Sequence, residues 1–238
     1  MRVYGASDVG KVRAINQDAY YLPAENENFA AVADGMGGHL AGEVASTMAI
    51  ELFARRMRVA RGVPEDALRD ALECANMAIY QASMEDANKR GMGTTFTSVW
   101  MGEGEAYLAH IGDSRAYLLR DGELSQISKD HTLVAELVAQ GHLTPQQAKT
   151  YPHRNYITRA LGVDMHVNVD VTRVDWVEDD VWFLCSDGMT NEVGEAEIRE
   201  ILLGSGGYQE KVEKLIALAI ERGGRDNITG VIVTTEEA

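Results

Sequence analysis

The sequence predicts an α+β fold in which antiparallel β-sheets are covered by helices, and the order of its apolar patterns is the main reason. A short apolar strand at residues 29–33 is followed by two stretches with helical spacing, at 42–57 and from residue 64 onward. A block of strand patterns then occupies residues 94–128. Because helices and strands do not alternate regularly along the chain, a doubly wound parallel sheet is disfavoured.

Each early element has its own local signal. Residues 29–33 (FAAVA) form a continuous apolar run, which is typical of a buried strand. The helix at 42–57 has one apolar face, made of Val44, Ala45, Met48, Ala49, Leu52 and Phe53. The next helix begins near Pro64, since proline suits the first turn of a helix.

The middle of the chain predicts an antiparallel meander. Its strands fall at residues 94–100, 105–111, 116–119 and 124–127, and glycine-containing turns separate them. A polar segment with short helices follows at about 130–162, and it includes a capping box at 144–147. The remaining predicted elements are a buried strand at 181–185, a helix at about 208–221 and a final strand at 228–234.

Composition favours one cytoplasmic domain over residues 1–238. Hydrophobic residues make up 45% of the 238, and no repeat or Pro/Ser-rich linker divides the chain. No apolar run is long enough for a membrane span, no secretory signal begins the chain, and two cysteines give no disulfide framework. The formal net charge of −15 argues against nucleic-acid binding, which needs a basic surface.

Four aspartates occur in similar settings beside glycine or at strand ends. Asp34 and Asp187 each follow an apolar strand and precede glycine, Asp113 lies in a turn between strands, and Asp226 precedes the last strand. Hard divalent cations prefer oxygen ligands of this kind. For any single Asp-Gly pair, an ordinary turn is the favoured explanation, whereas four aspartates in such settings are harder to explain in this way. The residues alone therefore leave a carboxylate metal site and a set of turns as open alternatives.

The chain resembles the metal-dependent protein phosphatases of type 2C, and in particular their compact bacterial members. The resemblance rests on eight segments in the family's order, which span almost the whole chain: residues 13–18, 34–39, 93–95, 112–115, 130–132, 158–162, 186–190 and 223–229. It implies a four-layer α-β-β-α sandwich, two packed antiparallel sheets flanked by helices. It also implies a serine/threonine phosphatase that activates water with paired Mn²⁺ or Mg²⁺ ions.

The resemblance also implies a role for each matching residue. Asp34 would bridge two ions, Gly35 would offer its carbonyl to one of them, and Asp187 and Asp226 would complete the other. Asp18 would lie behind the centre, and Asp113 would bind a third, weaker ion. Arg13 would hold the phosphate, although from the residues alone a surface ion pair is an alternative for it.

Two positions depart from the animal members of the family. Met36 stands where they carry a histidine thought to protonate the leaving group, and His39 is matched in bacterial relatives as a substrate-binding residue. Asn191 replaces an aspartate, which weakens the case for a third ion. Residues 130–162 correspond to a flap that borders the active site. His110 and His131 are predicted to be structural, and His142, His153 and His166 to lie on the surface.

Three functions are compatible with the sequence. The first is a phosphatase that acts on phosphorylated proteins, monomeric and without membrane contact, opposing a eukaryotic-like Ser/Thr kinase. The second is a non-catalytic phosphoprotein-binding module of the same fold, which the presence of Asp34, Asp187 and Asp226 disfavours. The third is a phosphatase dedicated to anti-sigma-factor antagonists. The sequence does not choose between Mg²⁺ and Mn²⁺.

Overall fold

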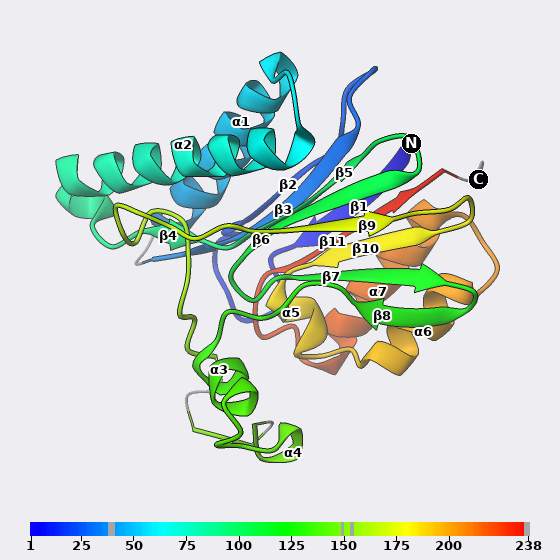
Figure 1. Cartoon of the computed structure of the whole chain (residues 1–238). Coiled ribbons are helices and arrows are strands. Elements are labelled where there is room, and N and C mark those ends of the chain that lie inside the picture. Colours follow the sequence, from blue (N-terminus) through cyan, green and yellow to red (C-terminus); the bar gives the residue numbers. More distant parts are fainter. Residues whose placement is uncertain (38–40, 149, 153–154, 236–238) are drawn as a thin grey trace.

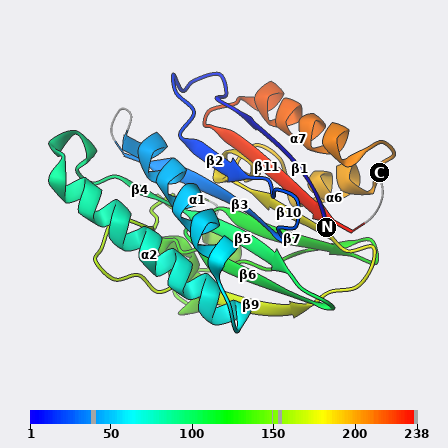
Figure 2. The same ribbon diagram turned by 90° about the horizontal axis from the view of Figure 1, so that it is seen from above.

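Two antiparallel sheets packed face to face form the centre of the molecule, with helices on both outer faces (Figures 1 and 2). The computed structural model describes residues 1–37, 41–148, 150–152 and 155–235. His39 lies outside the described residues. No helix in these ranges is long and apolar enough to cross a membrane. The predicted α+β sandwich of four layers is confirmed.

The strands of each sheet come from distant parts of the chain. The first sheet has the order β1 (Arg2–Asp8), β11 (Ile228–Thr234), β10 (Val181–Cys185), β7 (Arg115–Arg120) and β8 (Glu123–Gln126). The second has the order β2 (Asp18–Tyr21), β3 (Phe29–Met36), β5 (Phe96–Met101), β6 (Glu105–Ile111) and β9 (Asp170–Asp175), and β4 (Gly93–Thr94) also pairs with β3. Every ladder is antiparallel.

Alternating side chains of the strands build three apolar layers. In β3, Phe29, Ala31 and Ala33 pack under the helices α1 (Ala41–Val59) and α2 (Pro64–Glu85), whereas Ala30 and Val32 face the other sheet. In β10, Trp182 and Leu184 fill the space between the sheets. The opposite face of β10 packs against α6 (Glu195–Leu203) and α7 (Tyr208–Arg222). This period of two explains why both strands read as unbroken apolar runs.

The sequence patterns locate most elements but miss several. The strands predicted at 105–111, 181–185 and 228–234 have these bounds in the structure. The strand predicted at 94–100 is instead interrupted at Thr95, where the Asp34 amide donates to the threonine hydroxyl and not to a backbone carbonyl; β4 and β5 keep the same register against β3. The strands β1, β2 and β9 and the helix α6 were not predicted; the three strands lie at sheet edges, are short or partly polar, and are only partly buried.

A small helical flap extends from one end of the sandwich (Figure 1). It contains α3 (Leu133–Ala139) and α4 (Pro145–Ala148), and neither has a fully buried residue. The predicted capping box is present, since the Thr144 amide donates to Gln147 Oε1 (2.8 Å) and the Gln147 amide to Thr144 Oγ1 (3.2 Å). The other short helices are the 3₁₀ turn Ala87–Lys89 and α5 (Asp187–Thr190).

Candidate metal centre and adjoining groove

The predicted aspartates converge at one end of the sandwich. Asp18 opens β2 and is paired with Asp34 near the end of the antiparallel strand β3. Asp113 occupies the turn between β6 and β7. Asp187 follows β10, and Asp226 precedes β11, which pairs with β10. Because neighbouring antiparallel strands begin and end at a common edge, five carboxylates that are far apart in sequence share one region.

Two threonines hold Asp34 by its backbone. The Asp34 amide donates to Thr95 Oγ1 (2.9 Å), and the Asp34 carbonyl accepts from the Thr95 amide (2.9 Å) and from Thr94 Oγ1 (2.9 Å). The next residue, Gly35, packs so tightly that a Cβ atom there would lie 2.1 Å from the Gly42 carbonyl oxygen. The backbone at Asp34 and Gly35 is therefore fixed, and any side chain at position 35 would displace it.

Asp18 is held by hydroxyl groups from the other sheet. Ser186 Oγ and Thr229 Oγ1 both donate to Asp18 Oδ2, each at 2.7 Å. Since the single Thr229 hydroxyl proton points to Asp18, Ser7 donates to Thr229 Oγ1 (2.7 Å) and itself accepts from Asn16 Nδ2 (2.8 Å). This chain of hydrogen bonds fixes one carboxylate oxygen and leaves Asp18 Oδ1 without a partner among the described residues.

Asp187 and Asp226 lie near each other because Gly188, which follows Asp187, lets its backbone approach that of Asn227, which follows Asp226. A Cβ atom at Gly188 would lie 2.0 Å from the Asn227 carbonyl oxygen and 3.4 Å from Asp226 Cβ. Asn191 Nδ2 donates to Asp187 Oδ2 (3.0 Å). Asn191, which stands where the animal members of the family carry an aspartate, therefore positions Asp187.

Arg13 forms an ion pair with a candidate metal ligand. Its Nη2 donates to Asp226 Oδ2 at 2.7 Å, and its side chain is 52% exposed. Arg13 thus forms an ion pair, the alternative given for it from the sequence, but its partner Asp226 is itself a candidate metal ligand. A guanidinium has five N–H donors, so this contact leaves others available on a half-exposed side chain beside the candidate ligands.

Asn227 fastens the loop that carries Arg13. Its Oδ1 accepts from the Gln17 amide (2.8 Å), and its Nδ2 donates to the carbonyls of Val9 (3.0 Å) and Ile15 (2.9 Å). Ser186, Thr229 and Asn227 belong to the matched segments, but the sequence patterns assign them no role. Their functions depend on partners about two hundred positions away, which no local pattern reveals.

The carboxylates oppose one another's ionisation. Burial raises the pKa of Asp34 well above its usual range, and the nearby carboxylates of Asp18 and Asp187 raise it further. Burial likewise raises the pKa of Asp18 to about 7, although the two hydroxyl hydrogen bonds oppose this shift. It also raises the pKa of Asp113 to about 7, and the pKa of Asp187. Such mutual repulsion is relieved by positive charge placed between the groups.

The donor set fits hard divalent cations that keep part of their water shell. Asp18 Oδ1 and Asp113 Oδ1 are buried oxygens without a hydrogen-bond partner in the described part of the chain. Within that part, no three acidic, histidine or cysteine side chains form a compact cage for one ion. Mg²⁺-like ions are typically held by one or two carboxylates together with carbonyl and water oxygens, so an open arrangement of aspartates suits them.

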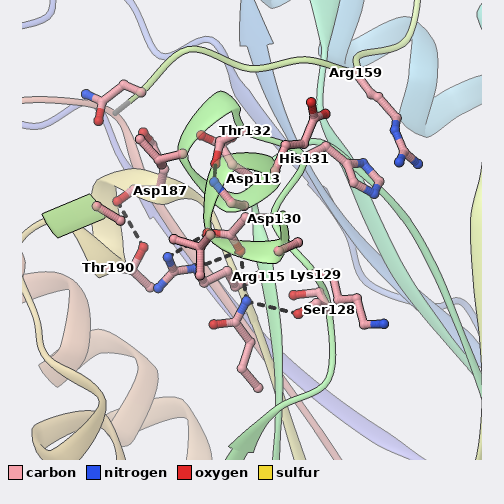
Figure 3. Close-up of a pocket in the computed structure, with 18 of the residues that line it drawn as sticks. Asp113, Arg115, Ser128, Lys129, Asp130, His131, Thr132, Arg159, Asp187 and Thr190 are labelled. Atoms are coloured by element: carbon pink, nitrogen blue, oxygen red, sulfur yellow. Dashed lines mark hydrogen bonds and ion pairs between the residues drawn. The ribbon is translucent and has the colours of Figure 1, made fainter. Parts of the chain in front are cut away.

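A groove of about 760 Å³ opens beside this centre, between the sandwich and the flap (Figure 3). Asp113 and Asp187 belong to both the centre and the groove. Arg115 and Asp130 form a two-pronged ion pair on the groove floor, with contacts of 2.6 to 3.0 Å. Apolar residues of the flap line the other side: Val134, Ala135, Val138, Ala139, Pro145 and Ala148.

The histidines are placed largely as predicted. His110 is 1% exposed and contacts Thr97 Oγ1 and the Lys129 carbonyl, each at 3.0 Å, so it is a core residue. His142 and His166 are exposed, and His153 lies outside the described residues. His131 is 4% exposed and contacts protein groups on both ring nitrogens, consistent with the structural role predicted for it.

Comparison with known proteins places the chain among phosphatases. The family model for protein phosphatase 2C matches residues 10–222. The serine/threonine phosphatase Stp of Listeria monocytogenes is 37% identical over 95% of this chain and 93% of its own length. PstP of Mycobacterium tuberculosis, also named a serine/threonine protein phosphatase, is 41% identical over 98% of this chain, which spans only 44% of PstP.

Solved structures agree with the sequence comparisons. The crystal structure of Mycobacterium tuberculosis PstP superposes with a TM-score of 0.92 at 40% identity, covering 99% of both chains. The PstP catalytic domain in complex with two manganese ions gives a TM-score of 0.87, covering 97% of this chain and 96% of that one. The family model, the sequence relatives and the fold together show that this chain belongs to the protein phosphatase 2C family.

Proposed function

We propose that this protein is a serine/threonine protein phosphatase that hydrolyses phosphoserine and phosphothreonine with Mn²⁺ or Mg²⁺ at the aspartate centre. The observation that carries the proposal is the convergence of five mutually repelling carboxylates, two of them with an unpartnered buried oxygen in the described part of the chain. The names of the relatives, and the two manganese ions in the PstP structure, support the same activity.

Specific residues are proposed to hold the cations. Asp34 and the Gly35 carbonyl would hold one ion, Asp34, Asp187 and Asp226 would hold a second, and Asp18 would support this pair. Asp113 and Asp187 are proposed for a third ion. When bound, such cations polarise phosphoryl oxygens and lower the pKa of a water molecule enough for it to attack phosphorus near neutral pH.

The protein's own groups are proposed to orient the phosphoester. Arg13, at the mouth of the site, donates N–H groups to phosphate oxygens, since its planar guanidinium matches their geometry. To reach a phosphate it rotates away from Asp226 or contacts both at once, and its half-exposed side chain has room for either. Met36 carries no proton to give, so protonation of the leaving oxygen falls to a water or to His39, which lies outside the described residues.

The groove beside the centre is the proposed place for the peptide around the phosphoresidue. It begins at Asp113 and Asp187 and continues beneath the apolar side of α3. An extended tripeptide spans about 10 Å, which equals the length of the seven-residue helix α3 at about 1.5 Å per residue. The proposed substrate is a protein phosphorylated by a eukaryotic-like Ser/Thr kinase. The enzyme is proposed to act as a cytoplasmic monomer.

Hydrolysis of a phosphothreonine peptide and of p-nitrophenyl phosphate tests this function. Both are measured with Mn²⁺, with Mg²⁺ and with EDTA, for the wild type and for Asp187→Ala. We expect turnover that requires a metal and is lost in Asp187→Ala, while circular dichroism shows that the variant remains folded. Full activity in Asp187→Ala would refute the metal assignment. Absence of turnover with either metal, together with phosphopeptide binding, would favour the non-catalytic binding module.

A further inference from the structure

His131 links three separate segments at the base of the flap. Its backbone amide donates to the Gly112 carbonyl (2.8 Å), and its Nδ1 accepts from the Gly112 amide (3.0 Å). Its Nε2 contacts Asp170 Oδ2 on β9 (3.1 Å), and its carbonyl accepts from the Thr158 amide (2.8 Å). We call residues 130–132 and 157–159, where the chain enters and leaves the flap, the flap neck.

The hydrogen bonds define the tautomer of this imidazole. Because a backbone amide can only donate, Nδ1 must be unprotonated, and the proton on Nε2 is then donated to Asp170. The two ring nitrogens therefore act on different segments, since Nδ1 holds the turn that carries Asp113 and Nε2 holds β9. Asp170 in turn accepts from Arg159 Nη1 (3.1 Å), which extends the contact to the second segment of the flap neck, residues 157–159.

The turn held by Nδ1 needs such support. Gly112 has a φ of +107°, and a Cβ atom there would lie 2.6 Å from Thr95 Cβ, so the turn is wedged against the residue that fixes Asp34. The next residue, Asp113, has a buried Oδ1 without a partner among the described residues. Because no group in that part of the chain holds this oxygen by a hydrogen bond, the place of the carboxylate depends on the position of the turn that carries it.

We propose that His131 is a positioning residue that fixes the Asp113 carboxylate through the Gly112 amide and couples it to the flap neck. The proposal rests on the proposed function in taking Asp113 as a cation ligand. It follows that cation binding at Asp113 and ordering of the flap neck favour each other, since coupling between two sites is reciprocal.

Two substitutions separate the contributions of the two ring nitrogens. In His131→Asn the amide oxygen can take the place of Nδ1 and still accept from Gly112, whereas the bond to Asp170 is lost. In His131→Gln the side-chain amide can reach Asp170 in place of Nε2, whereas the acceptor for Gly112 is lost. The two variants are neutral, polar and similar in size, so each is a control for the other.

Calorimetric titration with Mn²⁺ alone measures the effect on cation binding, with circular dichroism and a thermal melt in EDTA as checks of folding. We expect His131→Gln to weaken the Asp113-dependent binding step about five- to tenfold and His131→Asn to change it less than about twofold. In an Asp113→Asn background, His131→Gln should have no further effect, because it acts through that carboxylate. Equal effects of the two variants, or additivity with Asp113→Asn, would overturn the proposal.

A second measurement needs no change at His131 and therefore does not depend on the folding of those variants. Amide exchange followed by mass spectrometry, which paramagnetic Mn²⁺ does not disturb, should show that Mn²⁺ slows the exchange of peptides containing Thr158 in the wild type but not in Asp113→Asn. Exchange of Thr158 that ignores Mn²⁺ in the wild type would overturn the coupling. If the wild type bound no Mn²⁺, the metal centre of the proposed function would be refuted, and this proposal with it. If the wild type bound Mn²⁺ and the two His131 variants bound it equally well, only the role proposed for His131 would be refuted.

Discussion

The metal-free protein should become less stable as the pH rises through neutrality, and Asp18 offers a clean test. Burial and its neighbours raise the pKa of Asp18 from 3.8 to about 7 in the folded state. The unfolded chain then releases this proton first, so stability is intact below about pH 4 and falls until about pH 7. At about 1.36 kcal/mol per pKa unit, this difference corresponds to about 4 kcal/mol.

The substitution Asp18→Asn removes the charge and keeps most of the local contacts. The amide oxygen can still accept from Ser186 and Thr229. The amide nitrogen would occupy the place of Oδ1, which has no partner among the described residues, and an unpaired donor costs about 1–3 kcal/mol. Above pH 7 we therefore expect metal-free Asp18→Asn to be about 2 kcal/mol more stable than the wild type, or about 4–8 °C in Tm.

Urea unfolding in EDTA at several values between pH 4.5 and 8 measures this difference. The stability gain of Asp18→Asn should shrink toward zero or below as the pH falls, and in excess Mn²⁺ the wild type should be the more stable protein, because binding to the native state stabilises it. A gain that is constant with pH would show that the carboxylate charge is not its cause. A metal-free wild type that gains stability between pH 5 and 7 would refute the reasoning about the cluster.

Three other changes are expected to have distinct effects. Arg13→Ala should lower kcat/KM for a phosphothreonine peptide about 10- to 100-fold, as for a lost charged hydrogen bond; unchanged kinetics would make Arg13 a surface residue. Val138→Asp should lower kcat/KM for peptides with an apolar residue near the phosphothreonine about tenfold relative to p-nitrophenyl phosphate. Gln146→Asp makes the same charge change on the flap outside the groove and is the control. If the ratio of kcat/KM for the peptide to kcat/KM for p-nitrophenyl phosphate were equal in the two variants, the peptide would not bind in the groove. Asn227→Ala, which loses three hydrogen bonds at a 4%-exposed residue, should cost about 2–3 kcal/mol in urea unfolding, and a loss below about 1 kcal/mol would contradict its role in fastening the Arg13 loop.

The sequence identifies those parts of the fold whose signal is local. The strands β10 and β11 are apolar runs buried on both faces, and glycine or aspartate at their ends defines their limits. The strand β9 (DVTRVD) is different, because it lies at a sheet edge and its polar residues Thr172, Arg173 and Asp175 are exposed. Its position depends on pairing with β6, a distant partner that no local pattern specifies.

The candidate site likewise contains residues with a local sequence signal and residues whose role depends on distant partners. Asp34 and Asp187 were predictable as candidates because each follows an apolar run in the sequence and precedes glycine. The roles of Ser186 and Thr229 were not, since a serine or threonine at a strand end has no particular meaning until Asp18 is brought to it by the fold. The ion pair between Arg13 and Asp226 likewise joins residues 213 positions apart.

The position of β11 has a consequence for biosynthesis. This strand is the last of the sandwich strands to leave the ribosome, yet it lies between β1 and β10 and is the only partner of β1 among the described strands. Until it emerges, β1 has no partner and one edge of β10 stays open, so the nascent chain exposes strand edges of the kind that promote misassembly. Asp226 and Thr229 arrive with the same strand, so the aspartate cluster closes only after all the other strands of the sandwich have emerged.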